Sequence, residues 1–255
     1  MSVALREPRL KKRSQRPSQR LERLAPVNSD AIDTPCQLDP PGWLRLLHLP
    51  NHRKNLHCLE RSTLQCKRIL DVLVASLLLV IAFPIVVLAA IAIKLSSPGP
   101  VVFSQYRAGL FGKPFRIYKL RTMHQQASRQ GPTQVQVADD RIFPVGRFLR
   151  RMRIDELPQL INVLRGEMSM VGPRPECIEY LEELAAKVPD YPRRLGLKPG
   201  LTGIAQIEGG YANDLESYRR KVAYDLLYLQ HCCLANDLRI LARTTKVVCT
   251  GFGAL

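Results

Sequence analysis

The sequence contains few aromatic residues and none of the common catalytic motifs. Aromatic side chains make up 6% of the 255 residues, with one tryptophan, which argues against a base-stacking surface for single-stranded nucleic acid. The seven cysteines form no C-x-x-C pair, so we expect ordinary thiols in a reducing compartment rather than a disulfide framework. P-loop, G-x-G-x-x-G, H-E-x-x-H and G-x-S-x-G motifs are absent, which excludes the common nucleotide-binding, hydride-transfer, zinc and serine chemistries.

A structural zinc site also lacks support. His52, His57 and Cys58 lie close together in a basic polar stretch, but no second cluster has the spacing of metal ligands. We therefore interpret this stretch as a solvated linker, with a metal role for the three residues as the alternative.

Positive charge is in excess. The chain has 38 Lys and Arg against 22 Asp and Glu, a formal net charge of +16, which favours nucleic acid, anionic lipid or a phosphorylated substrate as partner. The start of the chain is basic but no apolar stretch follows it, so a secretory signal peptide is not expected. Residues 1–65 are predicted to be a basic, largely disordered extension, with a short helix near Trp43–Leu49.

One long apolar run dominates the chain. Val72–Ile93 contains 22 residues without a formal charge and only Ser76 as a polar side chain. As a helix it would be about 33 Å long, against about 30 Å for the hydrocarbon core of a bilayer. The run therefore predicts a membrane segment, which we place at residues 66–95.

Pro84 in the middle of this run predicts a kink or a break, because proline removes one backbone donor and clashes with the preceding turn. Basic residues flank the run on both sides: Arg61, Lys67 and Arg68 before it, and Lys94, Arg107, Lys113 and Arg116 after it. The positive-inside rule then favours both ends on the cytoplasmic side. We expect a re-entrant helix that enters one leaflet and returns, with a kinked single span as the alternative.

Residues 96–255 are predicted to form a cytoplasmic domain. Val101–Tyr106 and Phe115–Tyr118 read as a small β-hairpin around Gly109–Pro114, and residues 124–138 read as a loop. Helices are expected at Phe148–Arg153, Glu156–Arg165 (ending at Gly166), Glu176–Lys187, Leu215–Cys233 and Asp237–Cys249. The predicted fold class is α+β and mostly helical.

The densest group of reactive side chains follows the first of these helices. Asp155 and Glu156 are adjacent, and three arginines precede them at 150, 151 and 153. One interpretation is structural: Asp155 caps a helix, with Glu156 in its first turn and Pro158 where no hydrogen bond is lost. The other is chemical, because carboxylates that hold a cation or attack phosphorus, beside guanidinium groups that bind phosphate, suit phosphoryl transfer.

Two further segments supply cations. Lys119 and Arg121 end the predicted hairpin, where substrate sites are common. Arg174 lies between Pro173 and Pro175, so its side chain is expected on a stiff backbone. A solvated surface turn is the alternative interpretation for each segment.

The order of these features resembles the bacterial sugar transferase family, the small monotopic phosphoglycosyl transferases. The resemblance runs from about Cys66 to Val248. It rests on the strings KRILDVLVASLLLVIAFPIVVLAAIAIKLSSPGPVVFSQYRAG, YKLRTM, DDRIFPVGRFLRR, IDELPQLINVLRGEMSMVGPRP, LKPGLTGIAQIEG and YDLLYLQHCCLANDLRIL.

The resemblance implies a bacterial inner-membrane enzyme with its catalytic domain and amphipathic helices on the cytoplasmic face. Such enzymes transfer a sugar 1-phosphate from a UDP-sugar to undecaprenyl phosphate, use Mg²⁺, release UMP and initiate exopolysaccharide or related glycan assembly. Besides these substrates, anionic membrane lipid is an expected partner, and nucleic acid is not.

The resemblance also implies roles for residues. Asp155 would attack the sugar-linked phosphate and form a covalent intermediate, and Glu156 would bind Mg²⁺ or assist proton movement. The basic family positions that hold phosphates fall on Lys119, Arg150 and Arg174, and a further acidic position falls on Asp225, a second candidate metal ligand.

This chain departs from the family pattern at two places, and two alternative functions stay open. Met152 and Arg153 precede the dyad instead of small residues, and Glu208-Gly209-Gly210 replaces an Asn-Gly-Arg sequence, which affects sugar identity more than reaction class. The alternatives are a membrane glycosyltransferase that moves only the sugar, with UDP as product, and a non-enzymatic, membrane-anchored basic binding protein.

Overall fold

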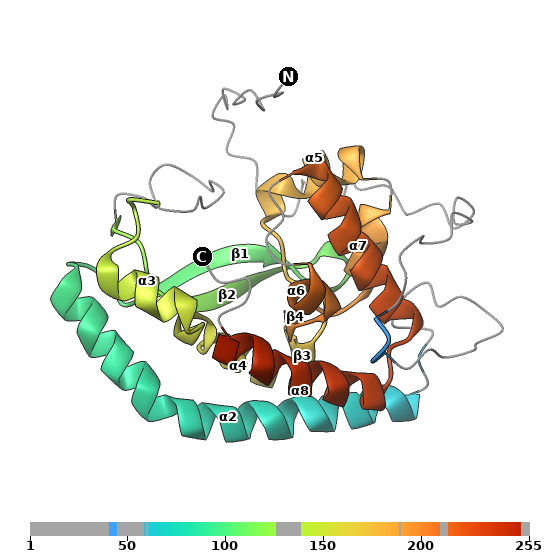
Figure 1. Ribbon diagram of the computed structural model, residues 1–255, viewed down its shortest axis with the longest axis horizontal. Coiled ribbons are helices and arrows are strands. Elements are labelled where there is room, and N and C mark those ends of the chain that lie inside the picture. The colour runs from blue at the N-terminus through green and yellow to red at the C-terminus, as the bar shows by residue number, and fades with distance from the viewer. Residues whose placement is uncertain are drawn as a thin grey trace.

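The computed structural model describes residues 41–44, 59, 61–125, 139–188, 190–209 and 214–250. The other residues, which include most of the predicted basic extension, the His52, His57 and Cys58 group, most of the predicted loop at 124–138 and Gly210, lie outside this description. Figure 1 shows one long helix, α2, running along the edge of a body made of shorter helices and two small sheets.

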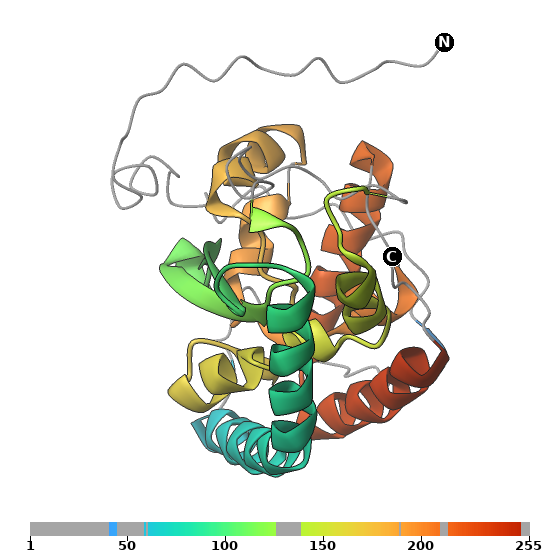
Figure 2. The ribbon, with the colours of Figure 1, turned by 90° about the vertical axis from the view of Figure 1, so that its left-hand side faces the viewer.

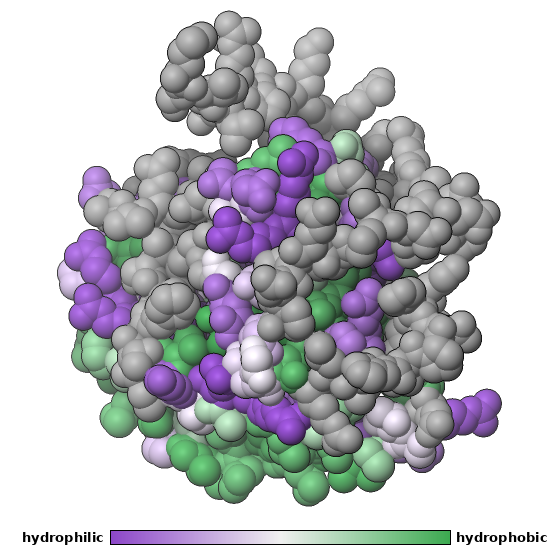
Figure 3. Space-filling model, turned by 45° about the vertical axis from the view of Figure 1, so that its right-hand side comes forward, coloured by the Kyte–Doolittle hydropathy of each residue, from purple (hydrophilic) through white to green (hydrophobic). Residues whose placement is uncertain are grey.

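Helix α2 spans Arg61–Ser96 and contains the predicted apolar run. Its most apolar window has a mean hydropathy of 3.0, and only 17% of that window is buried. Within the described part of the chain it is the one helix that is long and apolar enough to cross a membrane. Figure 3 shows apolar residues gathered along the edge of the molecule where α2 lies. This exposed apolar surface indicates membrane association.

The helix continues through Pro84 and bends rather than breaks. Figures 1 and 2 show the bend as a change of direction between its two halves. The buried face is lined with small residues, including Ala75, Ala82 and Ala89. These let the backbone of α2 approach the body closely, while the long aliphatic side chains point outward.

Both ends of α2 are tied to the same body. Near its start, Arg68 donates hydrogen bonds to the carbonyl oxygens of Val163 and Leu164, at 2.6 and 2.7 Å. Just beyond its end, the carbonyl oxygens of Ser97 and Pro98 accept hydrogen bonds from Arg121, at 2.5 and 2.8 Å. Both ends of the apolar run therefore lie against the same body.

The start of α2 also carries two buried charges. Lys67 pairs with Asp237 at 2.6 Å, and Asp71 accepts hydrogen bonds from Ser169 Oγ at 3.0 Å and from the Met170 amide at 2.8 Å. Because unpaired buried charges are costly, these contacts fix the rotation of α2 against the body.

The predicted hairpin is confirmed. Strand β1 (Val102–Ala108) pairs antiparallel with β2 (Pro114–Leu120), with Phe103 opposite Lys119. A second sheet was not predicted: β3 (Ser169–Val171) runs parallel to β4 (Gly200–Thr202). Gly172 and Gly200 touch through their backbones, and a Cβ atom on either would collide with the other chain segment. This close approach sets where the following Pro173–Pro175 segment leaves the sheet.

The helices confirm the mostly helical prediction, with shifted bounds. They are α3 (Pro144–Arg151), α4 (Gln159–Arg165), α5 (Ile178–Lys187), α6 (Ile204–Glu208), α7 (Leu215–Gln230), α8 (Leu234–Thr250) and the 3-10 helices η4 (Ile154–Glu156) and η5 (Tyr191–Gly196). Gly166 ends α4, as predicted, and the structure shows it in the left-handed conformation. Helix α6 and η5 were not predicted. The main core joins α2, α4, α5, α7 and β3 through fully buried residues such as Leu160, Met168 and Tyr191.

Candidate active site

Asp155 and Glu156 lie in the short turn η4, between α3 and α4. Both are buried, with exposed fractions of 7% and 8%. The chain enters this turn through Arg153, whose φ of 54° is left-handed. Helix α4 begins only at Gln159 and has no side-chain cap. The interpretation of Asp155 as a helix cap is therefore wrong, because the turn is a separate element.

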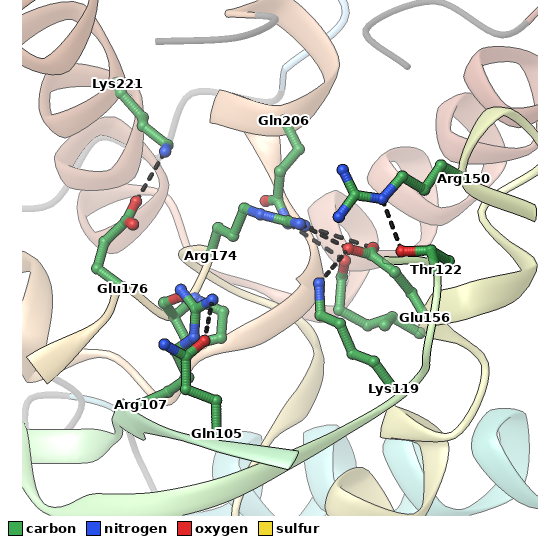
Figure 4. Close-up of polar contacts among 12 residues, drawn as sticks. Gln105, Arg107, Lys119, Thr122, Arg150, Glu156, Arg174, Glu176, Gln206 and Lys221 are labelled. Carbon is green, nitrogen blue, oxygen red and sulfur yellow. Dashed lines mark hydrogen bonds and ion pairs between the residues drawn. The ribbon is translucent and has the colours of Figure 1, made fainter. Parts of the chain in front are cut away.

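Glu156 is held by two cations from different elements, as Figure 4 shows. Lys119 of β2 contacts its Oε1 at 2.9 Å, and Arg174 Nη2 contacts the same oxygen at 2.6 Å. Burial by itself disfavours the carboxylate, but Arg174 and Lys119 outweigh it and hold the pKa of Glu156 well below its usual range. Glu156 is thus a fixed anion at neutral pH.

Asp155 is in the opposite electrostatic position. Burial and the neighbouring Glu156 charge raise its pKa to about 6, although Lys119, Arg150 and Arg174 oppose the rise. No described residue donates a hydrogen bond to its carboxylate. An anion that is buried, repelled and without donors is a destabilised ground state, and such carboxylates are typical of functional sites.

Three of the predicted phosphate-binding residues surround this pair. Arg150 of α3 donates from Nε to Thr122 Oγ1 at 2.8 Å, and the backbones of Gly146 and Thr122 are in direct contact, which fixes α3 against the end of β2. Burial lowers the pKa of Lys119, against the pull of Glu156. Lys119 and Arg174 thus contact Glu156, and Arg150 lies near them (Figure 4) and opposes the rise in the pKa of Asp155.

Arg121 is placed elsewhere. It follows Lys119 by two residues, but its two Nη atoms donate to the carbonyl oxygens of Ser97 and Pro98 beyond α2. The Arg121 guanidinium therefore contacts the segment just beyond the apolar helix, and a phosphate-binding role for Arg121 stays a prediction.

The loop that carries Arg174 is clamped from two sides. Arg194 Nη2 donates to the Arg174 carbonyl oxygen at 2.9 Å, and Arg107 Nη1 donates to the Pro175 carbonyl oxygen at 3.3 Å. The two arginine side chains thus satisfy consecutive carbonyl oxygens of the loop. The stiff backbone predicted for Pro173–Pro175 is thus reinforced by guanidinium groups.

Asp225 belongs to this support. Its Oδ2 accepts a hydrogen bond from Arg194 Nε at 2.8 Å, and both side chains are 3% exposed. Burial raises the pKa of Asp225 even though Arg194 opposes the rise. A metal-binding role for Asp225 stays a prediction, since one of its oxygens is already committed to Arg194.

Several residues of the site were not predicted: Thr122, Arg107, Arg194, Glu176, Lys221 and Gln206. Glu176 follows the Pro173–Pro175 loop and pairs with Lys221 of α7 at 2.8 Å. Gln206 of α6 points toward Arg174 in Figure 4, and its Oε1 is buried without a partner in the described part of the structure. Glu176 could have been found from the sequence, because it is a charged residue two positions after Arg174. The other five residues have no local sequence signal that links them to the site.

The site offers two neighbouring carboxylates, rather than a larger ligand cluster, to a magnesium ion. Among the described residues no group of three or more His, Cys, Asp and Glu side chains gathers as a metal cluster. Mg²⁺ commonly uses one or two carboxylates plus substrate phosphates, however. Asp155 and Glu156 are two neighbouring carboxylates, and Asp155 has a raised pKa that a nearby cation would relieve.

Comparison with known proteins shows the family to which the chain belongs. Residues 62–251 match the bacterial sugar transferase family. The chain is 48% identical over 186 residues to the UDP-glucose:undecaprenyl-phosphate glucose-1-phosphate transferase of Caulobacter vibrioides, a match that covers 72% of this chain and 70% of that protein.

Two further relatives are longer. A UDP-N-acetylgalactosamine-undecaprenyl-phosphate N-acetylgalactosaminephosphotransferase of Aeromonas hydrophila is 39% identical over 84% of this chain and 50% of its own length. A UDP-glucose:undecaprenyl-phosphate glucose-1-phosphate transferase of Escherichia coli K12 is 42% identical over 70% of this chain and 39% of its own length. The chain thus spans half or less of these two relatives.

Proposed function

Since this chain belongs to the bacterial sugar transferase family and is an enzyme, we propose that it transfers a sugar 1-phosphate from a UDP-sugar to undecaprenyl phosphate and releases UMP. The observation that supports this most is the pairing of two unlike carboxylates, Glu156 held by cations and Asp155 without donors. The relatives named above are named for UDP-glucose or UDP-N-acetylgalactosamine with undecaprenyl phosphate. Because these relatives differ in the sugar, the experiment below compares several UDP-sugars. The product would initiate exopolysaccharide or related glycan assembly.

Asp155 is the proposed nucleophile. One of its carboxylate oxygens attacks the phosphorus that bears the sugar, the bond from that phosphorus to the bridging oxygen breaks, and UMP leaves with the electron pair. The phosphate oxygen of undecaprenyl phosphate then attacks the same phosphorus and releases the Asp155 carboxylate. The raised pKa of Asp155 reflects an anion that loses little solvation when it reacts.

Charge neutralisation is the task of the surrounding residues. A carboxylate approaches a diphosphate only if positive charge offsets the repulsion, and Lys119, Arg150 and Arg174 supply it from three elements. We propose that Glu156, next to Asp155 in the turn, helps to hold Mg²⁺, which would supply further charge neutralisation at the diphosphate when bound. Glu156 keeps Lys119 and Arg174 oriented whether or not the ion is bound.

We further propose that α2 is re-entrant and that the catalytic body lies on the cytoplasmic face of the inner membrane. The support is geometric: Arg68 near one end of α2 donates to the carbonyl oxygen of Val163 in the body. Just beyond the other end, the Ser97 carbonyl oxygen accepts from Arg121 of the same body. A helix that crossed the bilayer would have to separate these two sets of contacts. The apolar outer face and the basic flanks of α2 suit insertion into one anionic leaflet.

The test is a product analysis. Membranes that contain the enzyme are incubated with undecaprenyl phosphate, Mg²⁺ and a panel of radiolabelled UDP-sugars, and the lipid-linked product and the nucleotide are measured. UMP release with retention of the labelled phosphate in the lipid is the expected result. Release of UDP would instead support transfer of the sugar alone and overturn the proposal.

A further inference from the structure

The short segment Pro41–Leu44 of the N-terminal region is docked on the catalytic body. The Leu44 amide closes a turn by donating to the Pro41 carbonyl oxygen at 2.8 Å. Leu44 is 6% exposed and belongs to the main hydrophobic core, against which Trp43 packs. We call residues 41–44 the anchor segment.

Trp43 joins two helices that are distant from it in sequence. Its indole Nε1 donates a hydrogen bond to Glu208 Oε1 at 3.0 Å, at the end of α6. The Arg243 guanidinium of α8 lies 4.6 Å from the centre of the indole ring, a cation–π distance. The anchor segment therefore connects the end of α6 to α8.

Helix α6 is too short to hold its position without contacts to other elements. It has five residues, Ile204–Glu208, and no side-chain cap at its start. A helix of this length is not stable by itself, so its position depends on side-chain contacts with its surroundings. The departure from the family pattern at Glu208 is expected to affect sugar identity, and Glu208 Oε1 accepts the hydrogen bond from Trp43.

The same helix reaches the active site. Gln206 lies two residues before Glu208, and Figure 4 shows its side chain extending toward the Arg174 guanidinium that pairs with Glu156. Its Nε2 donates to the Leu201 carbonyl oxygen at 3.2 Å, which leaves Oε1 buried without a partner among the described residues. A small shift of α6 would move this amide relative to Arg174.

We propose that Trp43 is a positioning residue for the UDP-sugar: by holding Glu208 it fixes α6 and so keeps Gln206 beside Arg174. The inference rests on the proposed transferase function, but it assigns a role to a segment outside the matched region, which begins at residue 62. The anchor segment thereby couples the N-terminal region to donor binding.

Kinetics on the full chain test this proposal with three variants. Trp43→Phe keeps a ring over Arg243 and removes the Nε1 hydrogen, Glu208→Ala removes the acceptor, and Glu208→Gln keeps an oxygen acceptor. We expect the first two to raise KM for the UDP-sugar about two- to fivefold, with kcat and the KM for undecaprenyl phosphate within twofold of wild type. Glu208→Gln should stay near wild type, and the double variant Trp43→Phe/Glu208→Ala should be no worse than either single one. Unchanged donor KM, or equal changes for both substrates, would overturn the proposal.

A second measurement does not depend on turnover. Trp43 is the only tryptophan of the chain, so fluorescence excited at the red edge of the absorption band, where tyrosine does not absorb, reports on its surroundings. Acrylamide should quench the fluorescence of Glu208→Ala more strongly than that of wild type or Glu208→Gln. Equal quenching in all three would contradict the contact itself. A wild-type enzyme that released no UMP would count against the proposed function, whereas these quenching results would still decide whether Trp43 holds Glu208.

Discussion

Arg194 donates one hydrogen bond to the carboxylate of Asp225 and another to the backbone carbonyl of Arg174, at 2.8 and 2.9 Å. Two residues buried behind the site thus set the place of an arginine that contacts Glu156. Arg194 also lies 5.2 Å from the centre of the Tyr191 ring. The arrangement connects Asp225 of α7, far from the dyad in sequence, to Glu156 through Arg194 and Arg174.

Arg194→Lys should lower kcat by about tenfold while half-saturation by Mg²⁺ stays within twofold of wild type. Lysine keeps a positive charge for Asp225 but lacks the forked donors that reach the Arg174 carbonyl, and misplacement of a binding group by about 1 Å can cost on the order of a hundredfold. Steady-state kinetics across a Mg²⁺ series measure both quantities.

Asp225→Asn separates the two roles open to Asp225. If Asp225 positions Arg194, the Mg²⁺ requirement stays unchanged; if it binds the ion, half-saturation rises by about tenfold or more. Asp190→Asn is the matched control, because Asp190 pairs with Arg193 in the same region but is 39% exposed at its side chain. It should be near wild type in both measurements.

Glu156→Gln should destabilise the protein by about 1–3 kcal/mol and abolish most activity. The amide removes the negative charge that balances Lys119 and Arg174, leaving two partly buried cations that repel each other. Thermal unfolding in detergent measures the stability change. The control is Glu183→Gln, which disrupts the exposed Glu183–Lys187 pair and should change stability by less than about 0.5 kcal/mol. An equally stable Glu156→Gln would show that the ion pairs contribute nothing.

The features predicted correctly from the sequence are those with a strong local signal. The apolar run of α2, the alternating strands of the hairpin and the terminating Gly166 each follow from a periodicity or a single residue with special backbone freedom. The Asp155–Glu156 pair and the Pro173–Pro175 loop were also predicted, because each is a short run of neighbouring residues in the sequence.

The features that were missed depend on contacts between distant segments. Strands β3 and β4 have three residues each and pair across about thirty intervening positions, so neither shows a usable period. The helix predicted from Glu156 begins at Gln159 because the dyad forms its own turn after left-handed Arg153. Arg194 and Asp225, or Trp43 and Glu208, become partners only once the chain has folded.

The topology of α2 is testable by labelling. Tags at residues 1 and 255 should both be protected from membrane-impermeant reagents added outside the cell, because both ends of α2 bond to one body. Pro84→Leu should reduce the bend, since leucine restores the missing backbone donor, and should expose tags placed after residue 96 in part of the population. A wild-type protein with its termini on opposite faces would contradict the re-entrant arrangement.

Activity should depend on pH through Asp155. Its pKa of about 6 means that the nucleophilic carboxylate gives way to the neutral acid as pH falls, so kcat/KM for the UDP-sugar should drop about tenfold from pH 7.5 to pH 5. The pKa of Glu156 lies well below this window, so Glu156 stays ionised throughout. Initial rates in buffers of constant ionic strength check this, and a flat profile between pH 5 and 7.5 would contradict Asp155 as the titrating nucleophile.

Asp155→Asn is the decisive substitution, because we expect it to lower activity and to raise stability. The amide has no anionic oxygen to attack phosphorus, so turnover should fall by at least about a thousandfold, some 4 kcal/mol in the barrier.

Stability should move the other way. Because the folded-state pKa of Asp155 is raised to about 6, its ionised form weakens the folded state once pH exceeds the ordinary value for an aspartate, and the full cost is present at pH 7. Asp155→Asn removes that cost and should stabilise the protein by about 1–3 kcal/mol at pH 7 and by much less at pH 4. Wild-type enzyme given only a labelled UDP-sugar should release UMP and retain the phosphosugar, and the variant should do neither. A variant that kept near-normal turnover, or lost stability at pH 7, would show that Asp155 is a structural residue of the turn.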